Sequence, residues 1–310
     1  MKAIIMNEYG DSNVLQYVDD FPDPILKDDD VLIEVKASAV NPIDWKLRQG
    51  YLKQMIDIPF PFILGLDVSG IVKEVGKEVT MFQPGDEVYA RADTSRNGSY
   101  AEKVAVNQLF VSKKPSNLNF EEAASVPLAA LTAYQALRDF AGLGEGERVF
   151  ISAGSGGVGS FAIQIAKILG AYVVTTTGPK NIDYVKSLGA DEVIDYTKND
   201  SLDTEPVDVV FDLIGGKSQI ESFSILKEGG RIGSIAGAPD PKLAKEKRAN
   251  AKGLWVKSSG ADLDELRNYI EAGKIKTEIA ARFPLEKVKV AHELSETGHV
   301  RGKIVIEVAK

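Results

Sequence analysis

The chain has 310 residues, of which 44% are hydrophobic, and its formal net charge at pH 7 is −8. This length suits two domains, because single hydrophobic cores usually stop growing at about 250–300 residues. The acidic balance argues against nucleic acid as the main partner, since phosphate binding usually needs a basic face. Cysteine is absent and the histidines are His292 and His299, which excludes disulfides, iron–sulfur clusters, cysteine nucleophiles and a structural cysteine zinc site.

The N-terminal residues lack the apolar core of about 7–15 residues that a signal peptide needs. No apolar run reaches the roughly 18 residues that suggest a membrane span. We therefore expect a cytoplasmic protein with no membrane partner.

The first 115 or so residues predict short strands, for example at 31–37, 70–75 and 85–90. Glycine and proline separate these strands, and the sequence at 83–86, Gln-Pro-Gly-Asp, predicts a turn. The pattern is typical of an irregular all-β barrel, whose last strand we expect at 99–106.

From about residue 120 the pattern changes to alternating helices and strands. One or two helices are expected at 121–140, interrupted near Pro127. Alternation of this kind predicts βαβ units and a parallel sheet, with strands at 149–153, 172–176, 192–195, 207–214, 231–236 and 253–256. A helix is expected at 262–272, and a final strand at 302–308 is a candidate for returning to the N-terminal domain.

A glycine run follows the first strand of this second part and opens a helix. Gly154, Gly156 and Gly159 have the G-x-G-x-x-G spacing, with Gly157 and Val158 inside the run. In a dinucleotide-binding turn these glycines allow a sharp bend, close approach of the backbone to a pyrophosphate, and tight helix packing. The alternative is an ordinary strand-to-helix turn, but the flanking strand and helix favour nucleotide binding.

The end of the second parallel strand indicates which nucleotide is bound. NAD enzymes place Asp or Glu there, about 20 residues after the glycines, to hold the ribose hydroxyls. Here the strand ends in Thr177, and Lys180 follows shortly. Hydroxyls and a lysine bind a 2′-phosphate that an acid would repel, so NADP(H) is favoured. The alternative for Lys180 is a solvated lysine at a helix start. Ile214, Gly215 and Ala236 end later strands, where ligands of open α/β sheets lie.

Five motifs in fixed order extend over the whole chain: Asn41-Pro42-Ile43-Asp44, Gly65-Leu66-Asp67-Val68-Ser69-Gly70, Ala129-Ala130-Leu131-Thr132-Ala133-Tyr134, Gly156-Gly157-Val158-Gly159 and Gly302-Lys303-Ile304-Val305. With them the chain resembles the medium-chain dehydrogenase/reductase superfamily, in particular its zinc-free, ζ-crystallin-like quinone oxidoreductase branch. Zinc-dependent members carry a cysteine near Ala39 and Gly-His-Glu at 65–67. The resemblance implies an α/β protein: a GroES-like irregular β-barrel domain at 1–120 and 273–310, and a Rossmann doubly wound parallel sheet at 121–272.

The resemblance also implies roles for individual residues. Asn41 and Asp44 correspond to residues of the nicotinamide cleft, although Asn, Pro and Asp in this order also suit a helix start. Thr132 corresponds to a threonine that touches the nicotinamide ribose, or else bonds its own backbone. Tyr196 corresponds to a tyrosine beside the 2′-phosphate, or is a half-buried edge aromatic. The lysine of the family often falls at Asn181, and Lys303 either closes the cofactor pocket or is an edge-strand charge.

The reaction implied is hydride transfer from NADPH to a quinone or to the β-carbon of an activated enone. Tyr51 and Asp44 are candidate proton donors, although a quinone can take its proton from water. Candidate residues lining the acceptor site are Trp45, Tyr51, Ile56 and Phe60. The alternatives are an alkenal or enone double-bond reductase and a non-catalytic NADPH-binding protein, whereas a zinc alcohol dehydrogenase lacks its ligands here. Family dimers pair their sixth strands, so a homodimer through 254–256 is expected.

Overall fold

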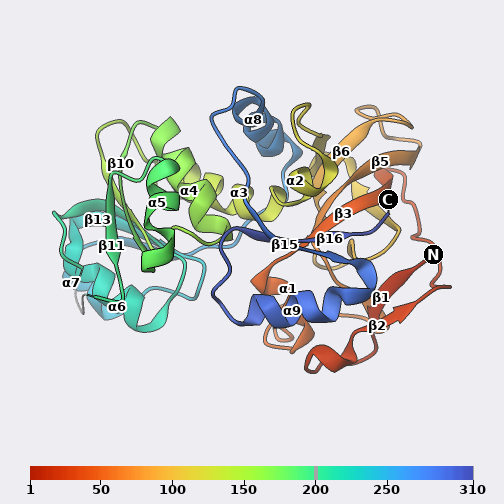
Figure 1. The fold of residues 1–310 in the computed structure, drawn as a ribbon, viewed down its shortest axis with the longest axis horizontal. Helices are drawn as coiled ribbons and strands as arrows, with labels where there is room; N and C mark the ends of the chain where they lie inside the picture. The colour runs from red at the N-terminus through yellow and green to blue at the C-terminus, as the bar shows by residue number, and fades with distance from the viewer. Residues whose placement is uncertain (199–201, 310) are drawn as a thin grey trace. The chain divides into compact units, whose positions relative to one another are not determined.

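A computed structural model describes residues 1–198 and 202–309 (Figure 1). The chain divides into two compact units, a barrel unit of Met1–Leu131 with Ser258–Lys310 and a parallel-sheet unit of Thr132–Lys257. The predicted boundaries at 120/121 and 272/273 differ from this division. Two helices that they assign to the second domain, α2 (Phe120–Ala124) and α8 (Gly260–Glu271), contact strands of the barrel unit.

The barrel unit is built on two sheets. One has the strand order β15-β16-β3-β5-β6-β8 with β7 also paired to β3, and the other has the order β2-β1-β4. The bounds are β1 Ala3–Met6, β2 Gln16–Val18, β3 Asp30–Val40, β4 Phe62–Ile63, β5 Asp67–Val75, β6 Glu87–Arg91, β7 Lys103–Asn107, β8 Val111–Lys113, β15 Ile279–Pro284 and β16 Lys303–Glu307. The final strand, β16, pairs antiparallel with β3, so the C-terminal segment does return to the N-terminal part.

Alternating side chains of the long strand β3 explain the barrel core. Val31, Ile33 and Val35 are fully buried in one hydrophobic cluster, as the period of two in a strand requires. A second cluster lies under the helices α1 (Pro42–Arg48) and α9 (Val288–Glu296), and it includes Leu47 and Val288. Short 3₁₀ helices lie at η1 Ser12–Val14, η2 Gln108–Phe110 and η5 Leu285–Lys287.

The parallel-sheet unit has the strand order β11-β10-β9-β12-β13-β14. Its strands are β9 Arg148–Ile151, β10 Tyr172–Thr177, β11 Glu192–Asp195, β12 Val207–Asp212, β13 Leu226–Ser234 and β14 Asn250–Gly253. Its helical elements are α3 Pro127–Tyr134, which begins in the barrel unit, η3 Gln135–Phe140, α4 Gly157–Ile168, η4 Pro179–Asn181, α5 Ile182–Ser187, α6 Gly216–Ile225 and α7 Pro241–Glu246. All its strand pairs are parallel, which confirms the predicted doubly wound sheet.

The order of the strands places the glycine run at the centre of this sheet. The chain proceeds from β9 to β10 and β11 on one side, then returns to β12, β13 and β14 on the other side. The reversal point lies between β9 and β12, where ligands bind in open α/β sheets. Buried Phe150, Val174, Val210 and Ile232 form the core around these strands.

Several predicted strands have different bounds in the structure, among them the strand predicted at 231–236, which is β13 at Leu226–Ser234. The edge strand β14 ends at Gly253 rather than covering 253–256, although the Leu254 N–H still donates to the Ser234 carbonyl at 2.7 Å. The strand predicted at 207–214 ends at Asp212, whose carboxylate binds the following turn. The strand predicted at 99–106 begins at Lys103. Among the described residues, no helix is both long enough and apolar enough to cross a membrane.

Candidate functional site

The turn between β9 and α4 is built for close contacts that side chains would prevent. A Cβ on Gly154 would collide with Thr175 Oγ1, and a Cβ on Gly159 would collide with the Ala153 carbonyl oxygen. Gly156 is the N-cap of α4, and Gly157 and Val158 are the first two residues of the helix. Because Gly156 has no side chain, nothing from the cap residue covers the first backbone N–H groups of the helix. Those N–H groups and the positive helix end can therefore bind an anion.

A second part of the parallel-sheet unit brings Ile214, Gly215 and Ala236 together. Gly215 has φ of 78°, and a Cβ there would lie 3.0 Å from the Ala236 Cβ. Asp212, at the end of β12, holds this turn: its carboxylate accepts from the backbone N–H of Ile214 at 3.1 Å and of Gly215 at 3.0 Å. Ser234 and Gln219 donate to its other oxygen.

The ends of β10 and β11 gather four of the predicted cofactor residues. Thr177 Oγ1 donates to Ser155 Oγ at 2.9 Å, and Asn181 Nδ2 lies 3.3 Å from the same oxygen. A Cβ on Gly178 would lie 3.4 Å from the Tyr196 hydroxyl, and the Tyr196 side chain is 56% exposed. Lys180 is also exposed. Donor side chains, of which Lys180 and Tyr196 are exposed and Thr177 is buried, thus follow the strand end at which an NAD enzyme has its acid.

The carboxylate beside Tyr196 is engaged within its own turn. Asp195 accepts from the Thr197 hydroxyl at 2.7 Å and the Thr197 N–H at 3.0 Å, and Lys198 lies 3.6 Å away. The Thr197 hydroxyl and backbone N–H, together with Lys198, lower the Asp195 pKa in spite of some desolvation. This acid therefore stays ionised, with its charge partly offset by Lys198.

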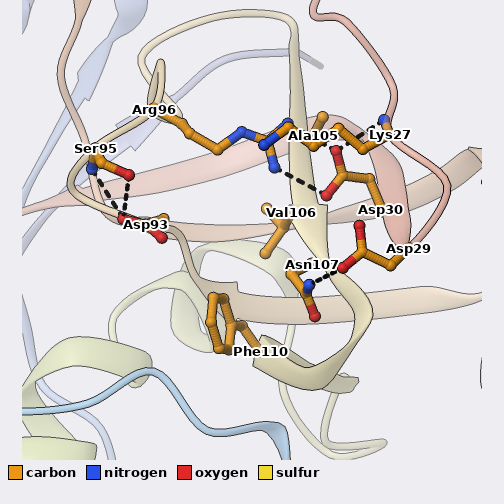
Figure 2. Close-up of a pocket in the computed structure, with 10 residues that line it drawn as sticks. All are labelled: Lys27, Asp29, Asp30, Asp93, Ser95, Arg96, Ala105, Val106, Asn107 and Phe110. Carbon is orange, nitrogen blue, oxygen red and sulfur yellow. Dashed lines mark hydrogen bonds and ion pairs between the residues drawn. The ribbon is translucent and has the colours of Figure 1, made fainter.

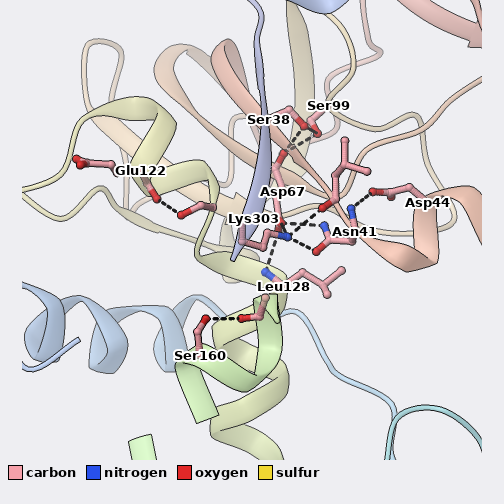
Figure 3. A network of polar contacts seen from close by, with 12 residues as sticks. Ser38, Asn41, Asp44, Asp67, Ser99, Glu122, Leu128, Ser160 and Lys303 are labelled. Carbon is pink, nitrogen blue, oxygen red and sulfur yellow. Dashed lines mark hydrogen bonds and ion pairs between the residues drawn. The ribbon is translucent and has the colours of Figure 1, made fainter. Parts of the chain in front are cut away.

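In the barrel unit, Asp67 is the centre of a buried polar cluster (Figure 3). Its Oδ1 accepts from the Leu128 N–H at 2.7 Å, and its Oδ2 accepts from Asn41 Nδ2 at 2.8 Å and from Lys303 Nζ at 3.3 Å. Ser38 and Ser99 donate to its carbonyl oxygen. The cluster joins β3, β5, β16, and the chain before α1 and at the start of α3.

Lys303 is held entirely by this cluster. Its ammonium donates to the Val40 carbonyl at 3.2 Å, to Asn41 Oδ1 and to Asp67 Oδ2, and its side chain is 5% exposed. Three acceptors satisfy its three donors. Asn41 occupies the N-cap position of α1 as its sequence suggested, while its amide contacts Lys303 and Asp67.

Asp44 is fully buried in the first turn of α1. Its Oδ2 accepts from the Asn41 N–H at 2.7 Å and from the Tyr100 hydroxyl at 3.0 Å. Burial is the main reason that its pKa rises to about 7; the Asp67 charge raises it further, while the Asn41 N–H, Tyr100 and Lys303 oppose the rise. A carboxyl with this pKa can hold or release a proton near neutral pH.

The remaining predicted residues have different environments. Thr132, in α3, is buried with 6% exposure. Tyr51 is 68% exposed, and its ring meets Trp45 edge-on at 6.3 Å. Phe60 is 39% exposed and packs edge-on against Tyr9 at 5.0 Å. The structure places Tyr51 outside the Asp67 cluster and brings Asn41, Asp44 and Lys303 into one connected network.

A cavity of about 410 Å³ lies elsewhere in the barrel unit (Figure 2), lined by Lys27, Asp29, Asp30, Asp93, Ser95, Arg96, Ala105, Val106, Asn107 and Phe110. Its carboxylates are already paired. Asp30 accepts from both Arg96 nitrogens at 2.8 and 2.7 Å, Asp29 accepts from Asn107, and Asp93 accepts from Ser95. The paired side chains that line this cavity therefore form a structural network of ion pairs and hydrogen bonds.

Within residues 1–198 and 202–309, no group of three or more His, Cys, Asp or Glu side chains is arranged to hold a metal ion. His292 is buried with its ring nitrogens on Arg48 and Tyr100, and the His299 ring contacts the Thr297 carbonyl. Catalytic zinc needs three protein ligands.

Comparisons with known proteins identify the family. The alcohol dehydrogenase GroES-like domain model matches residues 27–116, and the zinc-binding dehydrogenase model matches residues 188–306. A 2-methylene-furan-3-one reductase of Solanum lycopersicum is 39% identical over 99% of this chain and 79% of that protein. The chain belongs to the medium-chain dehydrogenase/reductase superfamily.

Two further relatives agree with this assignment. An NADPH-dependent alkenal/one oxidoreductase of Arabidopsis thaliana, a chloroplastic protein, is 38% identical over 99% of this chain and 79% of that protein. The solved quinone oxidoreductase of Coxiella burnetii has a TM-score of 0.91 and 39% identity, covering 100% of this chain and 99% of that chain. This superfamily member is an oxidoreductase with the GroES-like and Rossmann architecture that the resemblance implied.

Several residues that hold the candidate site were not predicted from the sequence. Asp67 lies inside a quoted motif, but its role as the partner of Lys303 depends on a contact over 236 residues. Arg48, Tyr100 and His292 had no local signal, because their contacts join α1, a loop and α9. Asp212 was detectable in principle, as an acid that ends a parallel strand.

Proposed function

We propose that the parallel-sheet unit binds NADP(H) and that the protein transfers hydride from NADPH to a quinone or a related activated carbonyl acceptor without zinc. The observation that carries the cofactor assignment is the end of β10. Thr177 and Asn181 contact Ser155 of the glycine turn there, Lys180 precedes Asn181 in the sequence, and a Cβ on Gly178 would lie 3.4 Å from the Tyr196 hydroxyl. A lysine and hydroxyls favour a 2′-phosphate. The 38% identical relative is named as NADPH-dependent, which supports the choice.

In this mechanism the protein binds and orients, and NADPH when bound supplies the hydride. The N–H groups at Gly156–Gly159 hold the pyrophosphate, and Thr177, Lys180, Asn181 and Tyr196 hold the 2′-phosphate end. Ile214, Gly215 and Ala236 border the cofactor at the strand ends. Thr132 is a further proposed cofactor contact of the parallel-sheet unit. In the barrel unit, Lys303 is a proposed cofactor contact and Asn41 a proposed catalytic residue, with Asn41 fixed by its contacts to Lys303 and Asp67.

A second candidate acceptor is an alkenal or enone, reduced at its carbon–carbon double bond. Two relatives favour it, since one is named an alkenal/one oxidoreductase and the other a 2-methylene-furan-3-one reductase. This reaction needs a proton as well as a hydride. Asp44 suits that need, because its pKa of about 7 lets it release a proton near neutral pH. Tyr51 suits it less, because its described contact is with the Trp45 ring rather than with the buried cluster. A non-catalytic NADPH-binding protein is the third alternative.

The test follows absorbance loss of NADPH, and separately of NADH, with 1,4-benzoquinone and with an alkenal. Enzyme-free controls are needed because quinones react slowly unaided. Quinone-dependent turnover that prefers NADPH supports the main proposal, and turnover on the alkenal alone replaces it with the second. NADPH binding without reduction of either acceptor leaves the non-catalytic alternative.

We also propose a cytoplasmic homodimer. β14 is the edge of its sheet, and Trp255, just after it, is 49% exposed. An exposed strand edge with apolar neighbours can pair with a second copy. A monomer by light scattering would refute the dimer, and fractionation of cells tests the location.

A further inference from the structure

A chain of hydrogen-bonded side chains runs through the barrel unit from the exposed Glu296 to the buried Asp44. Each of two packed helices contributes two residues one turn apart: Asp44 and Arg48 on α1, His292 and Glu296 on α9. Arg48 Nη2 donates to Glu296 Oε1 at 2.6 Å, and Arg48 Nη1 lies 3.1 Å from His292 Nδ1. Tyr100 completes the chain, with its hydroxyl 3.3 Å from His292 Nε2 and 3.0 Å from Asp44 Oδ2.

The chemistry of the groups fixes the direction of these bonds. A guanidinium is only a donor, so His292 Nδ1 must accept and the imidazole hydrogen must lie on Nε2. Nε2–H then donates to the Tyr100 oxygen, and the Tyr100 hydroxyl donates to Asp44. Burial, and the nearby Arg48 charge, lower the His292 pKa to about 3, so the ring is neutral, as this arrangement requires. From Arg48 Nη1 through His292 to Tyr100, the donors are directed toward Asp44.

The two oxygens of Asp44 therefore differ. Oδ2 accepts from Tyr100 and from the Asn41 N–H, whereas Oδ1 is buried and receives no hydrogen bond from the described residues. A proton on this carboxyl belongs on Oδ1, because Oδ2 already accepts two hydrogens. The ionisable groups that act on it are Asp67, Lys303 and Tyr100 directly, with Arg48 and Arg91 also coupled to the site.

Resting on the proposed function, we propose that Asp44 Oδ1 carries the proton delivered in enone reduction, and that Tyr100, His292 and Arg48 are positioning residues for it. Hydride from NADPH forms the new C–H bond at the β-carbon of the enone, and the C=C electron pair moves toward the α-carbon and carbonyl. The α-carbon takes the proton as the Oδ1–H bond breaks. NADP⁺, the saturated carbonyl and the Asp44 carboxylate remain, and the carboxylate regains a proton from water.

The first test needs no turnover. Infrared difference spectra of the whole protein, titrated across neutral pH, should contain a protonated-carboxyl C=O band that disappears as the pH rises. The band should be absent in Asp44→Asn. Its midpoint should shift upward in Tyr100→Phe, because the variant loses a donor to the charged form, and shift less in His292→Leu. Tyr89→Phe is the matched control, since Tyr89 is a buried tyrosine of the same unit whose hydroxyl donates to the Leu263 carbonyl; its midpoint should not move.

The second test separates the acceptors. Asp44→Asn should lower kcat for an alkenal by about 10²–10⁴-fold, the usual effect of losing a general acid, with NADPH affinity unchanged and a smaller loss on benzoquinone. In Tyr100→Phe the pH profile for the alkenal should shift upward together with the infrared midpoint. No titrating band, or an Asp44→Asn variant with wild-type alkenal kcat, would overturn the proposal. Absence of alkenal turnover in the wild type would refute the delivery step, while the infrared result decides the proton-holding role separately.

Discussion

The glycine turn and the Asp67 cluster differ in how far apart their residues lie in the sequence. The turn at 154–159 is continuous, and its partner Thr175 is only one βα unit away. The Asp67 cluster joins residues separated by 26, 61 and 236 positions. The first region depends on backbone shape and small residues, and the second on charge neutralisation in a dry interior. Substitutions in the turn should therefore weaken cofactor binding, whereas substitutions in the cluster should lower the free energy of unfolding.

Removing the Asp67 carboxylate should give the largest effect. Asp67→Ala leaves the Lys303 ammonium buried without its carboxylate, and breaking such a pair costs about 3–5 kcal/mol of unfolding free energy. Urea denaturation measures this change. Adding Lys303→Met should recover part of the loss, because the unpaired charge is then gone. A loss below about 1 kcal/mol in Asp67→Ala would contradict the account of the cluster.

The pH dependence of stability sharpens the account of the cluster. The Asp44 pKa is raised from 3.8 to about 7 in the folded protein, so between these values the folded state holds a proton that the unfolded state releases. The contribution of Asp44 to stability should therefore fall as pH rises from 4 to 7. Asp44→Asn lacks this term, so the unfolding free energy of the variant relative to wild type should rise across that window by up to about 4 kcal/mol.

The contribution of His292 to stability changes with pH in the opposite direction to that of Asp44. The His292 pKa is lowered from 6.5 to about 3, so its contribution is lost as pH falls below 6.5. Wild type and Asp44→Asn share this term, which cancels in the difference between them. A difference that stays constant between pH 4 and 7 would show that Asp44 is ionised throughout.

A side chain at the glycine turn should affect binding and leave folding intact. Gly156 has φ of −76°, which other residues adopt, and its nearest contact for a Cβ is the Ala153 carbonyl oxygen at 3.3 Å. Gly156→Val should weaken NADPH binding about 10- to 100-fold, or about 1.4–2.8 kcal/mol, by calorimetry. Gly144→Val is the control, because a Cβ there meets only Glu147 Oε2 at 3.8 Å. Equal losses in the two variants would indicate a general folding defect.

Lys180 should have the smallest effect. It is exposed, so its contribution to a 2′-phosphate is limited by solvent to about 1 kcal/mol. Lys180→Ala should reduce the NADPH-over-NADH preference about fivefold while NADH affinity is unchanged. Lys186→Ala, on α5, is the matched control. An unchanged preference in Lys180→Ala would indicate that Asn181 or Tyr196, rather than Lys180, contacts the 2′-phosphate.

The same contrast explains what the sequence could and could not predict. The alternating parallel strands and the glycine turn followed from local periodicity and spacing, because each depends on neighbouring residues. The doubly wound topology and the assignment of 273–310 to the GroES-like domain came from the family resemblance. Strand ends were less accurate, since Asp212 ends β12 through bonds to a turn and to Ser234. The Arg48–His292–Tyr100 chain was not predictable, because it forms only when α1 and α9 pack together. Lys303 was identified, but its partner Asp67 was not.

The most direct test of the central claim, zinc-independent reduction by NADPH, is the initial rate of NADPH oxidation with benzoquinone by chelator-treated protein whose zinc content is measured in the same sample. The account predicts full turnover with zinc far below one ion per chain, and no increase when zinc is added back. Activity that disappears on chelation and returns with one zinc per chain would contradict it.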